Sequence, residues 1–253
     1  MSIGVHAKAQ TGTVGNAITT ASVTTTSGST IILFAVCAFD VFGGTPVSDS
    51  KGNAWTQLST ELSYDTGIRF RAYKAVNITG GTGHTFTATP GASGYPALFM
   101  CEVLDVSASP TITADRGNAT SPPYVSPSIA PSTQCVLIAC CASDAPSGTE
   151  TDTFGGSFAS GDKIEEISDA NTSITGAMAA NVQTSGGTFS SSVTISGVTV
   201  TDTGNFIVAV ETNIGLGGAD DSDPSAWSSK NEWRGRGGGP QSRELQTQRG
   251  PIR

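Results

Sequence analysis

Histidine and carboxylate side chains could perform acid–base chemistry in this sequence, but few of them stand in a useful pattern. Only two histidines occur, His6 and His84, and neither adjoins a nucleophile in a motif typical of hydrolases. His84 alternates with Phe86 and Ala88, which indicates a packed or half-exposed histidine on a strand. Phosphate-binding loops and dinucleotide fingerprints do not occur either. The sequence therefore predicts no catalytic residue and no enzyme activity.

Two glutamates raise the alternative of glycoside hydrolysis. Glu102 and Glu211 end two apolar segments that occupy matching places in the sequence. A pair of carboxylates about 5–10 Å apart could cleave a glycosidic bond. Equivalent positions of a repeat also share residues for structural reasons, so we favour carboxylates that bond to turns at strand ends.

Metal and cofactor sites are not predicted. Residues 49–53 (Asp-Ser-Lys-Gly-Asn) lack the acidic ligands and closing glutamate of a calcium loop and are typical of a hairpin turn. The chain has five cysteines, and the adjacent Cys140 and Cys141 do not fit the ligand spacing of a zinc site. Cys37, Cys140 and Cys141 lie in apolar segments and indicate buried small hydrophobic residues, with a disulfide as the alternative.

Composition indicates an all-β protein. Only 13% of the 253 residues are charged, and Thr- and Val-rich segments are separated by Gly, Pro, Asn and Asp. No stretch of a dozen residues has the period of an amphipathic helix. The net charge of −8 would repel nucleic-acid phosphates, so no nucleic-acid partner is expected.

No association with a membrane is expected. The longest apolar run, residues 31–39, has nine residues and is too short to cross a bilayer as a helix. A basic start followed by an apolar run, which marks a secretory signal, is missing from residues 1–23. We therefore expect a soluble protein made in the cytoplasm of its host.

The order of similar segments predicts an internal duplication. Three blocks recur in the same order in the second half of the chain, at an offset of about 104 residues that grows slowly. The matching blocks are residues 29–40 with 133–144, 73–77 with 178–182, and 97–102 with 206–211. We therefore predict two diverged β-sandwich repeats, residues 1–106 and 107–215, followed by a Gly-rich extended tail, residues 216–253.

Each repeat is predicted to hold about six strands of a Greek-key or jelly-roll sandwich, because turn signals such as Gly43-Gly44 recur every ten residues or so. The strands expected in the first repeat are residues 14–26, 30–40, 54–62, 67–76, 82–89 and 97–106. Residues 31–39 are apolar on both faces of their strand, so the second repeat or a neighbouring subunit must cover one face.

A polar stripe on one predicted strand is the best binding candidate in the body of the chain. In residues 67–76, apolar side chains alternate with Arg69, Arg71 and Tyr73, which therefore share one solvent-facing side. The stripe is either an ordinary solvated strand face or a contact with an acidic neighbour or a sugar.

The tail, residues 216–253, cannot bury enough apolar surface to fold alone. We expect such an arm to lie against other subunits, with Trp227 and Trp233 as anchors and Arg234 and Arg236 as further contacts. One alternative is an uninformative remnant of expression or of a shifted reading frame. Another is an RGG-like nucleic-acid segment, although its match is a single short stretch whose charge nearby acids offset.

Two segments of the first repeat carry a family resemblance. Residues 47–56 contain the turn Asp-Ser-x-Gly-Asn-x-Trp-Thr, residues 73–77 read Tyr-x-Ala-x-Asn, and a final strand ends in Glu102. This pattern resembles β-sandwich proteins of tailed bacteriophages and bacterial surfaces. The resemblance covers residues 20–106 well and 130–215 weakly, because the second repeat lacks the turn. It implies a structural part of a virion or surface, with no catalytic residues to carry over.

Within that class we expect a capsid decoration (cement) protein that binds neighbouring coat subunits and stabilises the phage head. The missing secretion signal, the acidic body, strands that need partners and an arm that can reach neighbours favour it. Its partners would be copies of itself, in a homo-oligomer such as a trimer, and the major capsid protein or other subunits of the virion. The alternatives are a tail-fibre or receptor-binding module that holds host glycans, and a secreted carbohydrate-binding domain.

Overall fold

Thr- and Val-rich segments punctuated by glycine fold into antiparallel strands throughout the described chain. The computed structural model describes residues 1–39, 42–64, 67–144, 149–168, 174–200 and 202–211, which belong to one compact unit, Met1–Ile214. Strands make up 61% of the structure, and a single turn of 3-10 helix, Ser160–Asp162, is the helical element of this part. The predicted all-β class is confirmed.

The first half of the chain, residues 1–106, forms a large sheet and a small sheet. The large sheet has the order β1 (Ser2–Gln10), β11 (Tyr95–Leu104), β4 (Thr30–Ala38) and β8 (Ile68–Ala75), with β6 (Thr56–Gln57) and β7 (Leu62–Tyr64) both on β8. The small sheet has the order β2 (Ile18–Thr19), β10 (Phe86–Pro90) and β5 (Phe42–Asp49), and β3 (Val23–Thr25) pairs with β9 (Gly81–His84).

The second half, residues 107–211, repeats this order of strands. Its large sheet runs β12 (Ile112–Ala119), β19 (Thr203–Glu211), β14 (Cys135–Asp144), β17 (Ile174–Gln183) and β16 (Lys163–Ile167). Its small sheet runs β13 (Tyr124–Val125), β18 (Ser191–Ser196) and β15 (Thr151–Gly156). In both halves the first and last strands pair at one side of the large sheet, but the β3–β9 pair of the first half has no counterpart among the described strands of the second.

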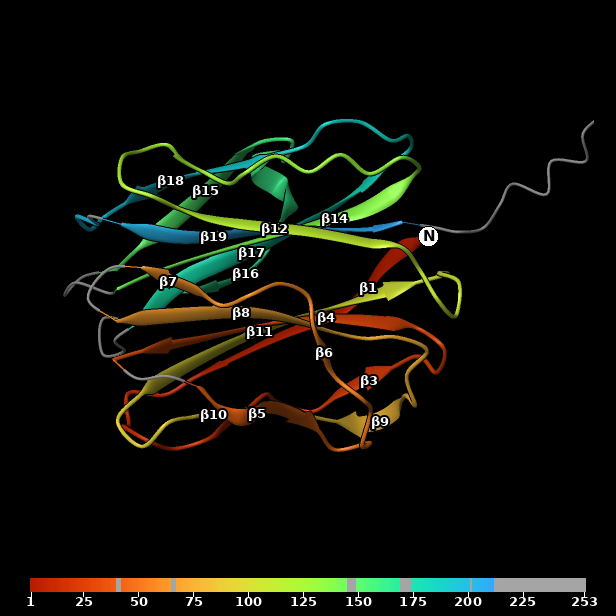
Figure 1. Ribbon diagram of the computed structural model, residues 1–253, viewed down its shortest axis with the longest axis horizontal. Coiled ribbons are helices and arrows are strands. Elements are labelled where there is room, and N and C mark those ends of the chain that lie inside the picture. Colours follow the sequence, from red (N-terminus) through yellow and green to blue (C-terminus); the bar gives the residue numbers. More distant parts are fainter. Residues whose placement is uncertain (40–41, 65–66, 145–148, 169–173, 201, 212–253) are drawn as a thin grey trace, which may run out of the picture. The chain divides into compact units, whose positions relative to one another are not determined.

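Three apolar clusters hold these sheets together in four layers (Figure 1). The central cluster joins the two large sheets and includes Phe34 and Phe70 of the first half and Phe206 of the second. Each outer cluster lies between a large sheet and the small sheet of the same half. Strand β4 therefore has a core on both faces, and the second half of the chain covers one of them, which explains the apolar pattern of residues 31–39.

The two large sheets face each other in a reciprocal arrangement. Strand β1 contacts β16, and β12, the counterpart of β1, contacts β7 at the other side. Reciprocal contacts of this kind are typical of an isologous, two-fold interface. His6 of β1 accordingly bonds Glu165 of β16 at 2.8 Å, and Arg116 of β12 donates a hydrogen bond to Thr60, close to β7.

Several predicted strand boundaries of the first repeat are wrong. Strand β1 is absent from the prediction, because its edge position leaves it half-buried and without a clear apolar alternation. Strand β5 is also absent, and Gly43-Gly44, predicted as a turn, lie inside it at an irregularity between the residues that pair with β10, Phe42 and Val47, where glycine suits a bulge. The expected strands at residues 14–26, 54–62 and 82–89 are each replaced by two shorter strands.

The cysteines are small core residues, as the apolar runs indicate. All five are buried and none forms a disulfide. Burial raises the pKa of the Cys101 thiol to about 12 and that of Cys135 to about 11, so both stay protonated at neutral pH. The preferred interpretation as buried small hydrophobic residues is confirmed.

Candidate functional site

The predicted polar stripe faces away from the central core and is only partly exposed to solvent. Tyr73 is only 5% exposed, within the outer cluster of the first half. The guanidinium of Arg71 donates to Glu61 at 2.7 Å and lies 5.3 Å from the centroid of the Phe42 ring. Arg69 also pairs with Glu61, at 3.6 Å. The expectation of a solvated face is therefore wrong for Tyr73, whereas Arg69 and Arg71 stay partly exposed with Glu61 as their acidic neighbour. Their expected contact with a partner stays a prediction.

The remaining predicted partner contacts, Trp227, Trp233, Arg234 and Arg236, lie outside the described residues. Their expected role in the tail therefore stays a prediction.

The two candidate glycosidase carboxylates hold loops in place. Glu102 is 1% exposed and accepts hydrogen bonds from the backbone of Val5 and Thr26 and from the hydroxyl of Ser29. Glu211 is 3% exposed and accepts four bonds from the backbone and hydroxyl groups of residues 132 and 133. Burial alone would raise the pKa of Glu211, but these bonds outweigh it and lower that pKa. Both carboxylates therefore bind turn residues at the ends of their strands, which is the structural role favoured from the sequence.

Asp49 and His84 form a second buried network. One oxygen of Asp49 accepts from His84 Nε2 at 3.0 Å, and His84 Nδ1 lies 2.7 Å from the hydroxyl of Thr25. This carboxylate–imidazole–hydroxyl order is that of a hydrolytic triad, and it joins three segments far apart in the sequence. The hydroxyl, however, belongs to a residue only 4% exposed, so a substrate could not reach it without opening the sheets.

The same Asp49 closes the turn at residues 49–53. It accepts from the backbone of Lys51 and Asn53 and from the indole of Trp55. Burial alone would raise the pKa of Asp49, but these donors outweigh it and the pKa is lowered. The turn connects β5 of the small sheet to β6 of the large sheet, so the predicted hairpin is wrong although the turn itself is present.

Two acidic residues of the second half were not singled out from the sequence. Glu150 and Asp152 are each only 1% exposed, between the small and the large sheet. Glu150 Oε2 accepts from the hydroxyl groups of Thr175 at 2.5 Å and Ser143 at 3.3 Å. The alternation of Glu150, Asp152 and Phe154 was the available signal, because residues two apart on a strand share a face and Phe154 is buried.

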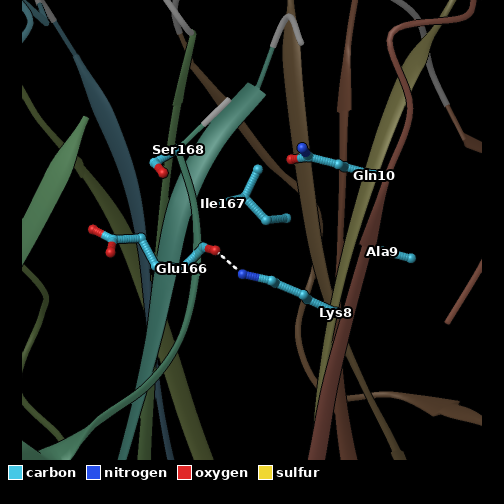
Figure 2. A pocket seen from close by; sticks show the side chains of 6 residues that line it. All are labelled: Lys8, Ala9, Gln10, Glu166, Ile167 and Ser168. Atoms are coloured by element: carbon cyan, nitrogen blue, oxygen red, sulfur yellow. Dashed lines mark hydrogen bonds between the residues drawn. The ribbon is translucent and has the colours of Figure 1, made fainter. Parts of the chain in front are cut away.

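A polar network extends from this pair to the junction of the two halves. Glu166 Oε1 accepts from the backbone N–H of Asp152 at 2.7 Å, and Glu166 Oε2 accepts from Lys163 at 2.8 Å. From the first half, Lys8 donates to the backbone oxygen of Glu166 (Figure 2). The network thus ties β1 to β16 and β16 to β15.

A pocket of about 360 Å³ opens at this junction, lined by Lys8, Ala9 and Gln10 of β1 and by residues 166–168. Figure 2 shows Lys8 extending to the backbone oxygen of Glu166 and Gln10 extending toward Ile167, while the carboxylate of Glu166 points away from both. The side-chain oxygen of Gln10 is buried and has no hydrogen-bond partner within the described part of the chain. The pocket could admit a small polar molecule, but it holds no acid–base pair.

Comparison with family models, curated proteins and solved structures gave no match. Any function therefore has to follow from the side chains of this chain itself. Across the described ranges, no three His, Cys, Asp or Glu side chains converge as metal ligands would. Nor does any helix in that part reach the length and apolarity needed to cross a bilayer.

Proposed function

We propose that this chain is a non-enzymatic structural protein of a phage virion. The observation that carries the proposal is the placement of its most reactive side chains. Glu102, Glu211 and the Asp49–His84 pair are buried and accept or donate the bonds that fix loops between layers. Releasing such a group would leave buried donors unpaired, which is costly, so these residues serve the fold rather than a reaction.

Within that class, a capsid decoration protein fits best. The turn motif that resembles phage β-sandwich proteins is closed by a hydrogen bond from the indole of Trp55 to Asp49 in the first half. We also propose that the two halves are diverged copies of one Greek-key or jelly-roll unit. The shared strand order and the equivalent roles of Glu102 and Glu211 support this duplication.

The test compares the full chain with a chain cut after Gly215 by size-exclusion chromatography with light scattering, and by co-sedimentation with empty heads of the virus that encodes it. A full-length variant with Trp227 and Trp233 replaced by alanine is the matched control for the loss of chain length. We expect the full chain to form homo-oligomers and bind heads, and both altered chains to bind weakly. If the full chain and both altered chains are monomers that do not bind heads but bind a glycan array equally well, the receptor-binding alternative is favoured.

A further inference from the structure

Three of the four carboxyl oxygens of the buried residues Glu150 and Asp152 lack the donors that a buried charge requires. Glu150 Oε1 and both carboxyl oxygens of Asp152 have no hydrogen-bond partner among the residues that the structure describes, whereas Glu150 Oε2 accepts from the hydroxyl groups of Ser143 and Thr175. Buried carboxylates are normally paired with cations or saturated with donors, as Glu102 is with three. The two side chains are within hydrogen-bonding reach of each other, so a shared proton is the partner that their geometry allows.

The surrounding groups do not neutralise two negative charges. The titratable side chains that act on the pair come from β13 (Tyr124), β14 (Cys140 and Cys141) and β16 (Lys163 and Glu166). Lys163 is the cation of this set, and its ammonium already bonds the carboxylate of Glu166 and the backbone oxygen of Asp152. Burial, and next the charge of Glu150, raise the pKa of Asp152 to about 9.

The pair stands where two layers of the second half meet. Glu150 directly precedes β15 of the small sheet and Asp152 lies on it, whereas Ser143 and Thr175 belong to β14 and β17 of the large sheet. In the first half, the counterpart acid is Asp49 at the end of β5, which His84 of β9 and the donors of the turn that leads to β6 saturate. The two halves therefore respond differently to loss of a proton.

We propose that Glu150 and Asp152 form a proton-dependent latch, which holds the small sheet of the second half against the large sheet while it carries a proton and loosens it when both carboxyls ionise. The physical reason is that two adjacent carboxylates in a buried site repel each other and lose their hydration. Opening lets both ionise in water, so deprotonation favours the open form.

Two cysteines give a matched readout within the full chain. Cys141 lies under the small sheet of the second half, and Cys37, at the equivalent position of the first half, lies under the other small sheet. Pulsed alkylation followed by mass spectrometry, from pH 6 to pH 9, gives the labelling rate of Cys141 divided by that of Cys37. The ratio removes the general increase of thiol reactivity with pH. We expect it to rise by up to about tenfold per pH unit, since opening releases one proton.

Two variants and one added ion decide the outcome. In Asp152→Asn, and independently in Glu150→Gln, we expect the ratio of Cys141 to Cys37 labelling rates to stay constant with pH. In the control Asp105→Asn, which changes an exposed acid, we expect this ratio to rise with pH as in the unaltered chain. Hydrogen exchange of β15 amides against β5 amides checks the result without thiol chemistry. A flat ratio in the unaltered chain would overturn the latch, and so would an equal slope in Asp152→Asn. Recovery of Cys141 protection at pH 9 by calcium chloride would also overturn it, because a cation would then be the partner.

Discussion

Replacing Phe206 with alanine should destabilise both halves of the chain, although Phe206 belongs to the second. Its ring lies 4.6 Å from the Phe70 ring and 6.1 Å from the Phe34 ring, centroid to centroid, and both partners belong to the first half. All three side chains are fully buried in the central cluster. The substitution therefore removes packing from both large sheets at once.

The expected loss follows from the size of the cavity left behind. Truncating a fully buried phenylalanine to alanine costs about 3–5 kcal/mol of the free energy of unfolding, because the lost burial adds to an unfilled cavity. In a unit of this size, each kcal/mol lowers the melting temperature by roughly 2–4 °C, so a decrease of about 6–20 °C is expected.

The assay follows each half separately in the full-length chain. Trp227→Phe and Trp233→Phe leave Trp55 as the one tryptophan, and it reports on the first half, where its ring packs against Phe86. Far-ultraviolet circular dichroism reports on all strands. We expect the two thermal transitions to coincide and to shift together in Phe206→Ala, because the central cluster makes unfolding cooperative.

A matched variant makes the test stricter. Phe154→Ala removes a buried ring from the outer cluster of the second half, with no first-half residue in that cluster. If the halves unfold as one, it too must move the Trp55 transition. A Trp55 transition that stays within about 1 °C in both variants, while circular dichroism separates into two steps, would refute the central core as the coupling element.

Three further predictions concern single residues of the first half and its junction with the second. Glu102→Gln should lower the free energy of unfolding by about 2 kcal/mol in urea titrations, because charge-assisted bonds to three buried or half-buried donors are weakened. The lowered pKa of Asp49 means that its stabilisation is present above the usual carboxyl pKa and is lost as pH falls through the folded value. Thermal melts below about pH 4 should therefore fall more steeply for the unaltered chain than for Asp49→Asn. Gly204→Ala should cost about 1–3 kcal/mol, since an added Cβ would overlap the ring of Tyr64 from the other half, whereas Gly161→Ala, which faces open space, should cost much less.

Much of the fold was predictable from the sequence, because buried strands carry a signal of their own. The two-faced apolar runs of β4 and β14 indicate strands covered on both sides, and the structure places a core on each face. Edge and outer strands were harder to predict. Strand β1 mixes small and polar residues because one of its sides is half-exposed, so pairing with β11 rather than local pattern fixes it.

The surroundings of single side chains were less predictable than the strands. Alternation on β8 predicted that Arg71 and Tyr73 lie on the side opposite Phe70, and the structure has Phe70 in the central cluster and Tyr73 in the outer one. The alternation could not show that Glu61 and Phe42, from two other segments, partly cover that side. In the same way, the spacing of Asp152 and Phe154 indicates a shared face, but the neighbours that Asp152 meets come from other strands. Local spacing determines the direction of a side chain, and only the assembled sheets determine its partners.

The two halves thus solve one physical problem, a buried acid between layers, in opposite ways. In the first half, donors stabilise the ionised form of Asp49, so its contribution to stability fades only in acid. In the second half, Asp152 binds a proton in the folded state that the unfolded chain releases, so its contribution falls as pH rises from about 4 toward about 9. The contribution of Asp49 to stability grows as pH rises from the acid range, and that of Asp152 shrinks as pH rises further. Together they favour greatest stability on the acid side of neutrality. They also make the second half, rather than the first, the part that loosens in alkaline solution.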